Sequence, residues 1–264
     1  MIKLIITDMD GTLLTSDNRL PDEFDTIYQQ VKAAGIQFVV ASGRQYHILK
    51  QEFEHIDHNI LFVAENGGFI DYGKGTLLLH PFSKPDIREL IEAIRKIEGI
   101  YPVIGGRDSA YIENDHPDFL KEVEAYFVKC RKVDDLTCVD DELLKIAVCD
   151  LRNPEFNSYP ILKSFNNRFQ VSVSSHIWLD IMPLKVNKGE AVRFLQQHLG
   201  ITTEETMVFG DYLNDYQMMQ MAYHSYAMAN AHPELKKVAR FSTHSNDDNG
   251  VLKTIEEKLL ILPE

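Results

Sequence analysis

Residues 2–12 read IKLIITDMDGT, and the expected architecture of the whole chain is built around this stretch. Residues 2–6 (IKLII) are apolar except for Lys3, which predicts a short buried strand. Asp8 and Asp10 follow this strand. Side chains two positions apart on an extended segment point to the same side, so both carboxylates are expected to face one point at the carboxyl end of a sheet. Open α/β sheets bind their ligands at that edge.

Strand and helix patterns alternate in the first and last parts of the chain. The expected elements are strand 2–6, helix 24–34, strand 36–41, helix 46–53, strand 60–64, helix 188–199, strand 206–209, helix 215–221, strand 223–229, and two helices that begin at Pro233 and after Gly250. This alternation predicts an α/β fold with a doubly wound, Rossmann-like parallel sheet that carries helices on both faces.

Residues 83–182 differ in character from the two parts that flank them. The expected elements here are helix 87–97, strands 101–104 and 110–112, helix 119–128, strand 144–148, helix 159–165, and the paired strands 169–173 and 177–182. This order predicts an inserted α+β domain with an antiparallel sheet. The insertion would divide the chain into a core made of residues 1–82 and 183–264 and a second domain made of residues 83–182.

Composition excludes several classes of function. The chain has 264 residues and a formal net charge of −13, which disfavours a nucleic-acid partner because such proteins present a basic face. No secretory signal is visible, and no segment approaches the roughly 18 apolar residues of a membrane span. Cys130, Cys138 and Cys149 are odd in number and lack CxxC spacing, so neither disulfides nor a zinc site is expected. We expect a cytoplasmic protein, monomeric or weakly dimeric, without a membrane partner.

Two acidic motifs follow predicted strands and indicate a metal site. At about 4 Å and an effective dielectric constant of about 20, two like charges such as those of Asp8 and Asp10 repel by roughly 4 kcal/mol. A hard cation offsets this repulsion, and Mg²⁺ is the usual choice beside phosphate. The second motif, residues 210–215 (GDYLND), would add Asp211 as a ligand, with Asp215 and Asn214 in support. The alternative readings are a polar turn for the first motif and a solvated loop that caps the next helix for the second.

Two further motifs carry groups that can bind a phosphate. Ser42, Gly43 and Arg44 follow the second strand, where a hydroxyl, a close backbone approach and a helix N-terminus can meet phosphate oxygens. Arg44 could equally form an ordinary ion pair. Lys188 begins a predicted helix, a place that disfavours positive charge, which indicates a role beside carboxylates and phosphate. Its alternative is a surface lysine.

Together these segments resemble a known family. DMDGTL (8–13), ASGR (41–44), NKG (187–189) and GDYLND (210–215) stand in the order and context of the haloacid dehalogenase superfamily of phosphatases. ENGG (65–68), MANAHPELK (228–236) and the inserted domain are similar to its Cof-like subgroup, which carries a IIB-type cap. The resemblance implies that Asp8 is the nucleophile, Asp10 the general acid and base, Ser42 and Lys188 the phosphoryl contacts, and Asp8, the Asp10 backbone carbonyl and Asp211 the Mg²⁺ ligands, with Asn214 and Asp215 in support.

The expected activity is Mg²⁺-dependent hydrolysis of a small phosphomonoester through an aspartyl-phosphate. A sugar phosphate and a phosphorylated cofactor such as pyridoxal phosphate or FMN are both open as substrates. One alternative is a phosphosugar mutase like the related phosphomannomutases, and another is a catalytically idle binding or regulatory protein. In the cap, His116, Trp178 and Arg107 could contact substrate, although a surface or core position is the favoured interpretation of each.

Overall fold

The strand that follows the N-terminus, β1 (Leu4–Thr7), lies inside an eight-stranded sheet, and its four side chains are buried. It pairs in parallel with β2 (Gln37–Ala41) on one side and with β12 (Thr206–Gly210) on the other. The order is β14-β13-β12-β1-β2-β3-β4-β5. Its remaining strands are β3 (Leu61–Ala64), β4 (Phe69–Asp71), β5 (Leu77–Leu79), β13 (His224–Ala227) and β14 (Phe241–Ser242). The strand order reverses between β1 and β12, and such a reversal leaves a crevice at the carboxyl ends.

The computed structural model describes residues 1–56, 59–72, 77–127, 129–184 and 186–259. Helices of the core are α1 (Phe24–Ala33), α2 (Tyr46–Phe53), α6 (Lys188–Leu199), α7 (Tyr216–Gln220), α8 (Pro233–Val238) and α9 (Gly250–Leu259). The predicted α/β class is confirmed, and each predicted core strand and helix is present within a few residues. The short strands β4, β5 and β14 were not predicted, and β3, β4 and β5 pair antiparallel at the sheet edge.

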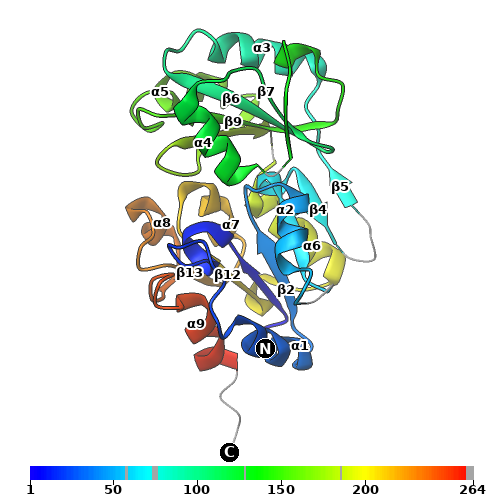
Figure 1. Ribbon diagram of the computed structural model, residues 1–264. Coiled ribbons are helices and arrows are strands. Elements are labelled where there is room, and N and C mark those ends of the chain that lie inside the picture. Colours follow the sequence, from blue (N-terminus) through cyan, green and yellow to red (C-terminus); the bar gives the residue numbers. More distant parts are fainter. Residues whose placement is uncertain (57–58, 73–76, 128, 185, 260–264) are drawn as a thin grey trace, which may run out of the picture.

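A second sheet of six strands lies above the carboxyl ends of the core strands (Figure 1). Its order is β10-β11-β9-β6-β7-β8, formed by β6 (Ile100–Gly106), β7 (Ala110–Ile112), β8 (Cys130–Lys132), β9 (Leu143–Asp150), β10 (Phe169–Val173) and β11 (Trp178–Pro183). All neighbouring pairs are antiparallel except β7 and β8, which are parallel. The predicted antiparallel sheet therefore has one unpredicted parallel edge strand, β8.

Helices cover both faces of this second sheet. They are α3 (Lys84–Ile94), α4 (Pro117–Tyr126) and the short α5 (Tyr159–Leu162). α3 packs in one apolar cluster with Ile146, whereas α4 packs in another with Ala147. Neighbouring side chains of a strand point to opposite faces, so α3 and α4 lie on opposite sides of the sheet.

The segments that join the two sheets are short. β5 ends at Leu79 before α3 begins at Lys84, and β11 ends at Pro183 before α6 begins at Lys188. We propose residues 1–82 with 183–264, and 83–182, as the limits of the core and the cap. Residue 128, where a cap helix was predicted to end, and residues 260–264 lie outside the described residues. Among the described helices, none combines the length and the apolar character that a bilayer crossing requires.

Candidate active site

A buried lysine bridges two carboxylates at the centre of the crevice. Lys188, the first residue of α6, is fully buried, and its Nζ lies 2.5 Å from Asp8 Oδ1 and 2.7 Å from Asp215 Oδ1. Burial alone would lower the pKa of Lys188, but the two carboxylates raise it above its ordinary value. The side chain is therefore a permanent positive charge beside Asp8, and the alternative of a surface lysine is wrong.

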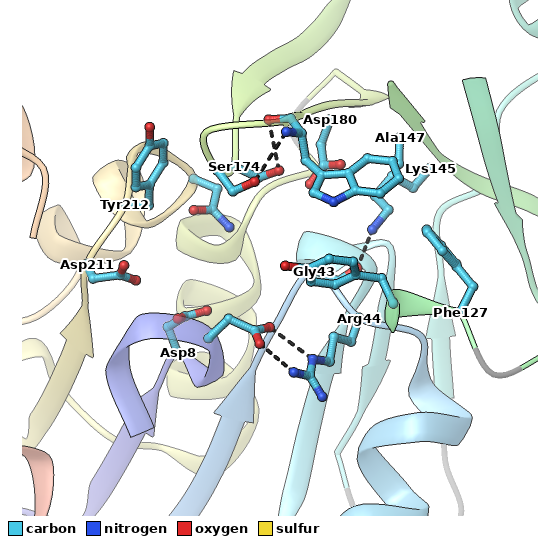
Figure 2. A pocket seen from close by; sticks show the side chains of 15 residues that line it. Asp8, Gly43, Arg44, Phe127, Lys145, Ala147, Ser174, Asp180, Asp211 and Tyr212 are labelled. Carbon is cyan, nitrogen blue, oxygen red and sulfur yellow. Dashed lines mark hydrogen bonds and ion pairs between the residues drawn. The ribbon is translucent and has the colours of Figure 1, made fainter. Parts of the chain in front are cut away.

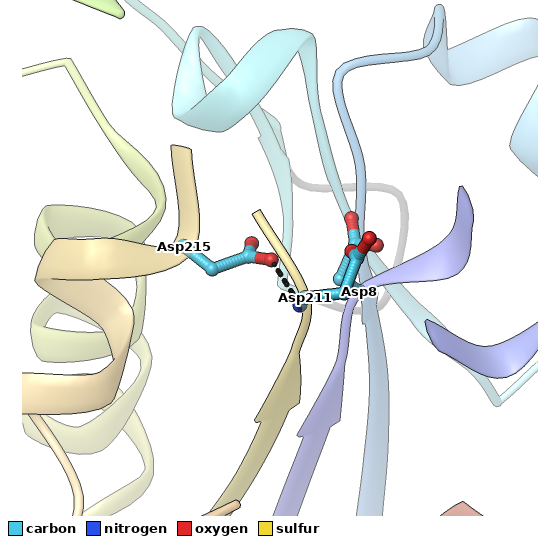
Figure 3. Close-up of side chains that lie close together, drawn as sticks. All are labelled: Asp8, Asp211 and Asp215. Atoms are coloured by element: carbon cyan, nitrogen blue, oxygen red, sulfur yellow. Dashed lines mark hydrogen bonds between the residues drawn. The ribbon is translucent and has the colours of Figure 1, made fainter. Parts of the chain in front are cut away.

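The side chains of three aspartates converge: Asp8 after β1, Asp211 after β12, and Asp215 just before α7 (Figure 3). Oxygen atoms of Asp8, Asp211 and Asp215 all lie within 4.8 Å of one another. Asp215 Oδ2 accepts the backbone N–H of Asp211 at 3.0 Å, and the Thr12 hydroxyl donates to Asp211 Oδ1 at 3.0 Å. The loops after β1 and β12 therefore hold their carboxylates in place, as the strand-end motifs predicted.

The charge balance of this cluster fits a divalent cation. Burial raises the pKa of Asp8 to about 7, against the opposing pull of Lys188. Burial and the neighbouring Asp8 carboxylate also raise the pKa of Asp211 well above its usual range. One ammonium group is thus too little positive charge for three carboxylates, of which Asp8 and Asp215 are buried and Asp211 is partly buried. An all-oxygen donor set that lacks positive charge suits a hard cation of the Mg²⁺ kind.

The turn after β1 requires a glycine. Gly11 has a φ angle of +74°, a conformation that side chains with a Cβ rarely adopt. A Cβ at this position would also collide with the Asp211 carboxylate. Gly11 therefore lets the loop after β1 pass close to the Asp211 carboxylate. The side-chain amide of Asn230 donates to the Gly11 carbonyl at 2.7 Å.

Asp10 is held by Arg44 in a two-pronged ion pair (Figure 2). Arg44 Nε lies 3.0 Å from Asp10 Oδ2, and Nη2 lies 2.5 Å from Oδ1. Nη1 of the same guanidinium reaches Glu52 Oε2 at 3.2 Å. Burial would lower the pKa of Arg44, but Asp10 outweighs it and raises that pKa. Of the two roles left open for Arg44, the structure shows the ion pair, in a largely buried side chain that also lines the pocket.

The remaining predicted residues surround the cluster at different depths. Ser42 is fully buried, and its hydroxyl oxygen accepts the Arg44 backbone N–H at 3.1 Å. Gly43 lines the pocket, and so does Asn214, whose amide donates to Asn66 Oδ1 at 3.1 Å. The fold thus brings the predicted residues to one edge of the sheet, with Ser42 beneath the pocket surface.

A buried polar network that the motifs did not predict joins the core to the cap. Lys145 of β9 lies 2.9 Å from Glu65 Oε2 and also donates to the carbonyl of Gly43. Asn66 donates to Asp180 Oδ2 of β11 at 2.5 Å. Two signals were available in the sequence: a lysine inside the apolar run LLKIAV (143–148), and ENGG, which was noted only for its resemblance to the family. In the ENGG segment, Glu65 and Asn66 have positive φ angles of 49° and 52°.

A pocket lies between the core and the cap. Its core wall includes Asp8, Asp10, Gly43, Arg44, Asp211 and Asn214, and its cap wall includes Tyr126, Phe127, Lys145, Ala147, Trp178 and Asp180. Of the three cap residues considered from the sequence, Trp178 lines this pocket. His116 instead stacks on Tyr101, and Arg107 pairs with Glu142 at 2.8 Å.

Comparisons with known proteins agree with this geometry. The family model of haloacid dehalogenase-like hydrolases matches residues 5–255. The 5-amino-6-(5-phospho-D-ribitylamino)uracil phosphatase YbjI of Escherichia coli K12 is 34% identical over 266 residues, covering 98% of this chain and 96% of the relative. The HMP-PP phosphatase of Cronobacter sakazakii is 27% identical over 248 residues, covering 89% of this chain and 87% of the relative.

A solved structure shows the same fold over the whole length. The crystal structure of SMU.1108c from Streptococcus mutans UA159 matches with a TM-score of 0.92 at 29% identity, covering 98% of this chain and 100% of that one. Phosphoryl-transfer enzymes of this superfamily generally use a divalent metal ion. The resemblance seen in the sequence is confirmed: the chain belongs to the haloacid dehalogenase-like hydrolases and is a phosphatase of that family.

Proposed function

We propose that the protein hydrolyses the phosphomonoester of a small metabolite, that the reaction requires Mg²⁺, and that Asp8 carries the phosphoryl group between two steps. The observation that carries this proposal is the position of Asp8. Its carboxylate is buried at the carboxyl end of β1, contacts the Lys188 ammonium at 2.5 Å, and shares a cluster with Asp211. A carboxylate attacks phosphorus adequately when nearby positive charge neutralises the phosphoryl oxygens.

The proposed metal ligands are Asp8, the backbone carbonyl of Asp10, and Asp211, with Asp215 and Asn214 in support. The bound ion would neutralise phosphoryl oxygens and orient the ester. Asp215 supports the site from two sides, because it accepts the Asp211 backbone N–H and also pairs with Lys188. Asp215 therefore holds Asp211 and Lys188 in fixed positions relative to each other.

In the first proposed step, an Asp8 carboxylate oxygen bonds to phosphorus while the bond from phosphorus to the leaving oxygen breaks. Asp10 would leave its ion pair with Arg44 and take up a proton from solvent as the substrate binds, and it would give that proton to the leaving oxygen. In the second step Asp10 takes a proton from water, whose oxygen attacks phosphorus and releases phosphate and the Asp8 carboxylate. The Arg44 ion pair keeps the Asp10 carboxyl at the rim of the pocket.

The proposed phosphate contacts are Lys188, the Ser42 hydroxyl, the backbone at Gly43, and Arg44, with Asn214 at the opposite side. Ser42 already accepts the Arg44 N–H, so its own hydroxyl proton can donate to a phosphate oxygen. Together with Lys188 these groups supply donors around a charge that becomes more spread in the transition state.

The name of one relative suggests the size and class of the substrate. The name of the Escherichia coli relative states that it acts on 5-amino-6-(5-phospho-D-ribitylamino)uracil. We propose a substrate of that size, either a sugar phosphate or a phosphorylated cofactor such as pyridoxal phosphate or FMN. Such a leaving group would lie in the pocket that Asp8 and the cap residues line.

The test is the Asp8→Asn variant, assayed by phosphate release from a panel of phosphorylated metabolites with Mg²⁺ present. An amide cannot attack phosphorus, so we expect turnover to vanish on every substrate that the parent hydrolyses. Asp140→Asn, which changes the charge equally at an exposed site, is the matched control and should keep the parent rate. More than roughly a tenth of the parent rate in Asp8→Asn would contradict the mechanism.

A further inference from the structure

Asn66 lies where the cap meets two loops of the core. It belongs to the turn that follows β3, and it is 1% exposed. Its φ angle of 52° lies in the left-handed region, which asparagine tolerates better than most residues. Its backbone N–H donates to the carbonyl of Ser42 at 3.0 Å. The side chain of Asn66 therefore projects from a turn that is fixed to the loop after β2.

The side-chain amide of Asn66 joins groups that belong to the two domains. Its Nδ2 donates to Asp180 Oδ2 of β11 at 2.5 Å, and its Oδ1 accepts from Asn214 Nδ2 at 3.1 Å. Asp180 and Asn214 both line the pocket, and Figure 2 shows Asp180 on the cap side. Asn214 lies between β12 and α7. One buried amide thus connects a strand of the cap with the loop that carries Asp211 and Asp215.

The cap sets the direction of these hydrogen bonds. A carboxylate can only accept, so Asp180 holds the NH₂ group of Asn66 toward the cap. The carbonyl oxygen of Asn66 then faces the core, and the NH₂ group of Asn214 turns toward it. The carbonyl oxygen and the second N–H of Asn214 are left for other partners. Without Asp180, either end of the Asn66 amide could face Asn214, and the orientation of Asn214 would no longer be fixed.

We propose that Asn66 is a positioning residue that transmits the docking of the cap to Asn214, so that Asp180 strengthens Mg²⁺ binding at a site in the other domain. We call these three side chains the Asp180–Asn66–Asn214 relay. The inference rests on the proposed function, because it takes Asn214 as a support of the metal ligands. Coupling between two sites is reciprocal, so bound Mg²⁺ should also favour the docked cap.

Two substitutions at Asp180 test the relay, with Mg²⁺ alone as the ligand. Asp180→Ala and Asp180→Asn remove the same charge, but only asparagine keeps an oxygen that can accept from Asn66. Calorimetric titration of the substrate-free protein measures the Mg²⁺ dissociation constant. We expect this constant to rise roughly five-fold in Asp180→Ala, the effect of one net hydrogen bond, and to stay near the parent value in Asp180→Asn. Equal dissociation constants in the two variants would overturn the inference.

A double-mutant cycle tests whether Asn66 is the link. Asn66→Gly accepts the positive φ angle and removes the side-chain amide. We expect this variant to bind Mg²⁺ more weakly than the parent. Adding Asp180→Ala should then change the dissociation constant by less than roughly two-fold, because the relay is already broken. A further loss as large as that in the parent background would show that Asp180 acts by another route, which overturns the inference.

Glu155→Ala is the matched control for loosening of the cap. It removes a cap carboxylate that contacts Tyr212 and His232 of the core, and it leaves Asn66 with both of its partners. Its Mg²⁺ dissociation constant should equal that of the parent. A rise as large as the one in Asp180→Ala would show that any weakening of cap docking lowers metal affinity, and the role of Asn66 would be refuted.

Metal binding and hydrolysis are measured separately, so the two proposals can fail independently. If calorimetry separates Asp180→Ala from Asp180→Asn while no phosphorylated metabolite is hydrolysed, the proposed function fails and the relay is supported. If the parent hydrolyses esters but both variants bind Mg²⁺ as tightly as the parent, the relay is overturned and the proposed function is unaffected. A parent protein that binds no Mg²⁺ would overturn the relay together with the proposed metal requirement.

Discussion

Lys188 carries a positive charge at the first residue of a helix, where its side chain is fully buried. A cation near a helix N-terminus is disfavoured by about 0.3–1 kcal/mol. Removing one member of a buried ion pair, by contrast, costs about 3–5 kcal/mol. The contacts with Asp8 and Asp215 therefore outweigh the helix dipole, and the lysine is stable where helix rules alone would exclude it.

Gly11 is required for two reasons: its φ angle is positive, and a Cβ at this position would meet the Asp211 carboxylate. Comparing Gly11→Ala with a glycine that has only the positive φ angle separates the two effects. The added Cβ meets the Asp211 carboxylate, so we expect loss of most phosphatase activity together with reduced stability. Gly35 has a similar φ angle of +71° with open space around it, which makes Gly35→Ala a matched control. It should lower the unfolding free energy by about 1 kcal/mol and retain the parent kcat/KM. Equal activity losses in the two variants would contradict a specific role for Gly11.

Asp211 carries a prediction about the metal. Asp211→Asn removes one charge from the cluster, so the Mg²⁺ concentration for half-maximal activity should rise at least roughly 10-fold. Titration of chelator-treated protein with Mg²⁺ measures this, with phosphate release as the signal. The parent should be inactive in EDTA and recover with Mg²⁺. Full activity of the parent in EDTA would contradict a metal-dependent reaction.

At the scale of single elements, the sequence predicted those site residues that stand at strand ends. Asp8 and Asp211 follow short apolar runs, and a parallel sheet brings such ends to one edge, so their neighbourhood followed from pattern alone. Lys145 lies in the middle of β9, and its partner Glu65 is far away in the chain. This ion pair between the cap and the core depends on how the two domains lie relative to each other. The local periodicity of the sequence does not contain that information. The strand β14 has only two residues, which is too short to show a period in the sequence.

The ion pair that links β9 to the core predicts a strong stability effect. Lys145→Met leaves Glu65 buried without its partner, so the unfolding free energy should fall by about 3–5 kcal/mol. The double variant Lys145→Met/Glu65→Gln removes the stranded charge and should recover part of this loss. Denaturant unfolding at fixed pH measures both values. A double variant that is less stable than Lys145→Met would contradict this account.

The same pair sets a pH dependence. Burial raises the pKa of Glu65 above its ordinary value of 4.5, against the pull of Lys145 and with a smaller upward push from Asp180. The folded state then holds a proton that the unfolded state releases, so stability falls as the pH rises from about 4.5 through the folded-state pKa. Lys145→Met should extend this fall to higher pH, and the double variant should abolish it. Parallel stability–pH curves for the two variants would be the contrary result.

Across the whole molecule, the cap is tied to the core on two sides of the pocket. On one side lies the buried network of Lys145, Glu65, Asn66 and Asp180. On the other, Glu155 of the cap accepts from Tyr212 and contacts His232 of the core, both at 3.3 Å. The first group is buried and the second is partly exposed to water. Ion pairs in water contribute little, about 0–1 kcal/mol, so the buried side should dominate cap closure.

This asymmetry predicts how the shape of the protein responds to mutation. Lys145→Met should shift the population toward an open cap and increase the radius of gyration measured by small-angle X-ray scattering. Glu155→Gln, the matched control on the other side, should leave the scattering curve near that of the parent. A larger change in Glu155→Gln than in Lys145→Met would show that the partly exposed contacts of Glu155, and not the buried network, hold the cap closed.

The pairing of β1 with β12 has a consequence for biosynthesis. Thr7 lies beside Phe209 in the central sheet, so Asp8, the proposed nucleophile, leaves the ribosome long before the strand that completes its surroundings. A nascent chain presents Asp8 without Lys188 or Asp211. We therefore expect a chain that terminates before β12 to have no phosphatase activity.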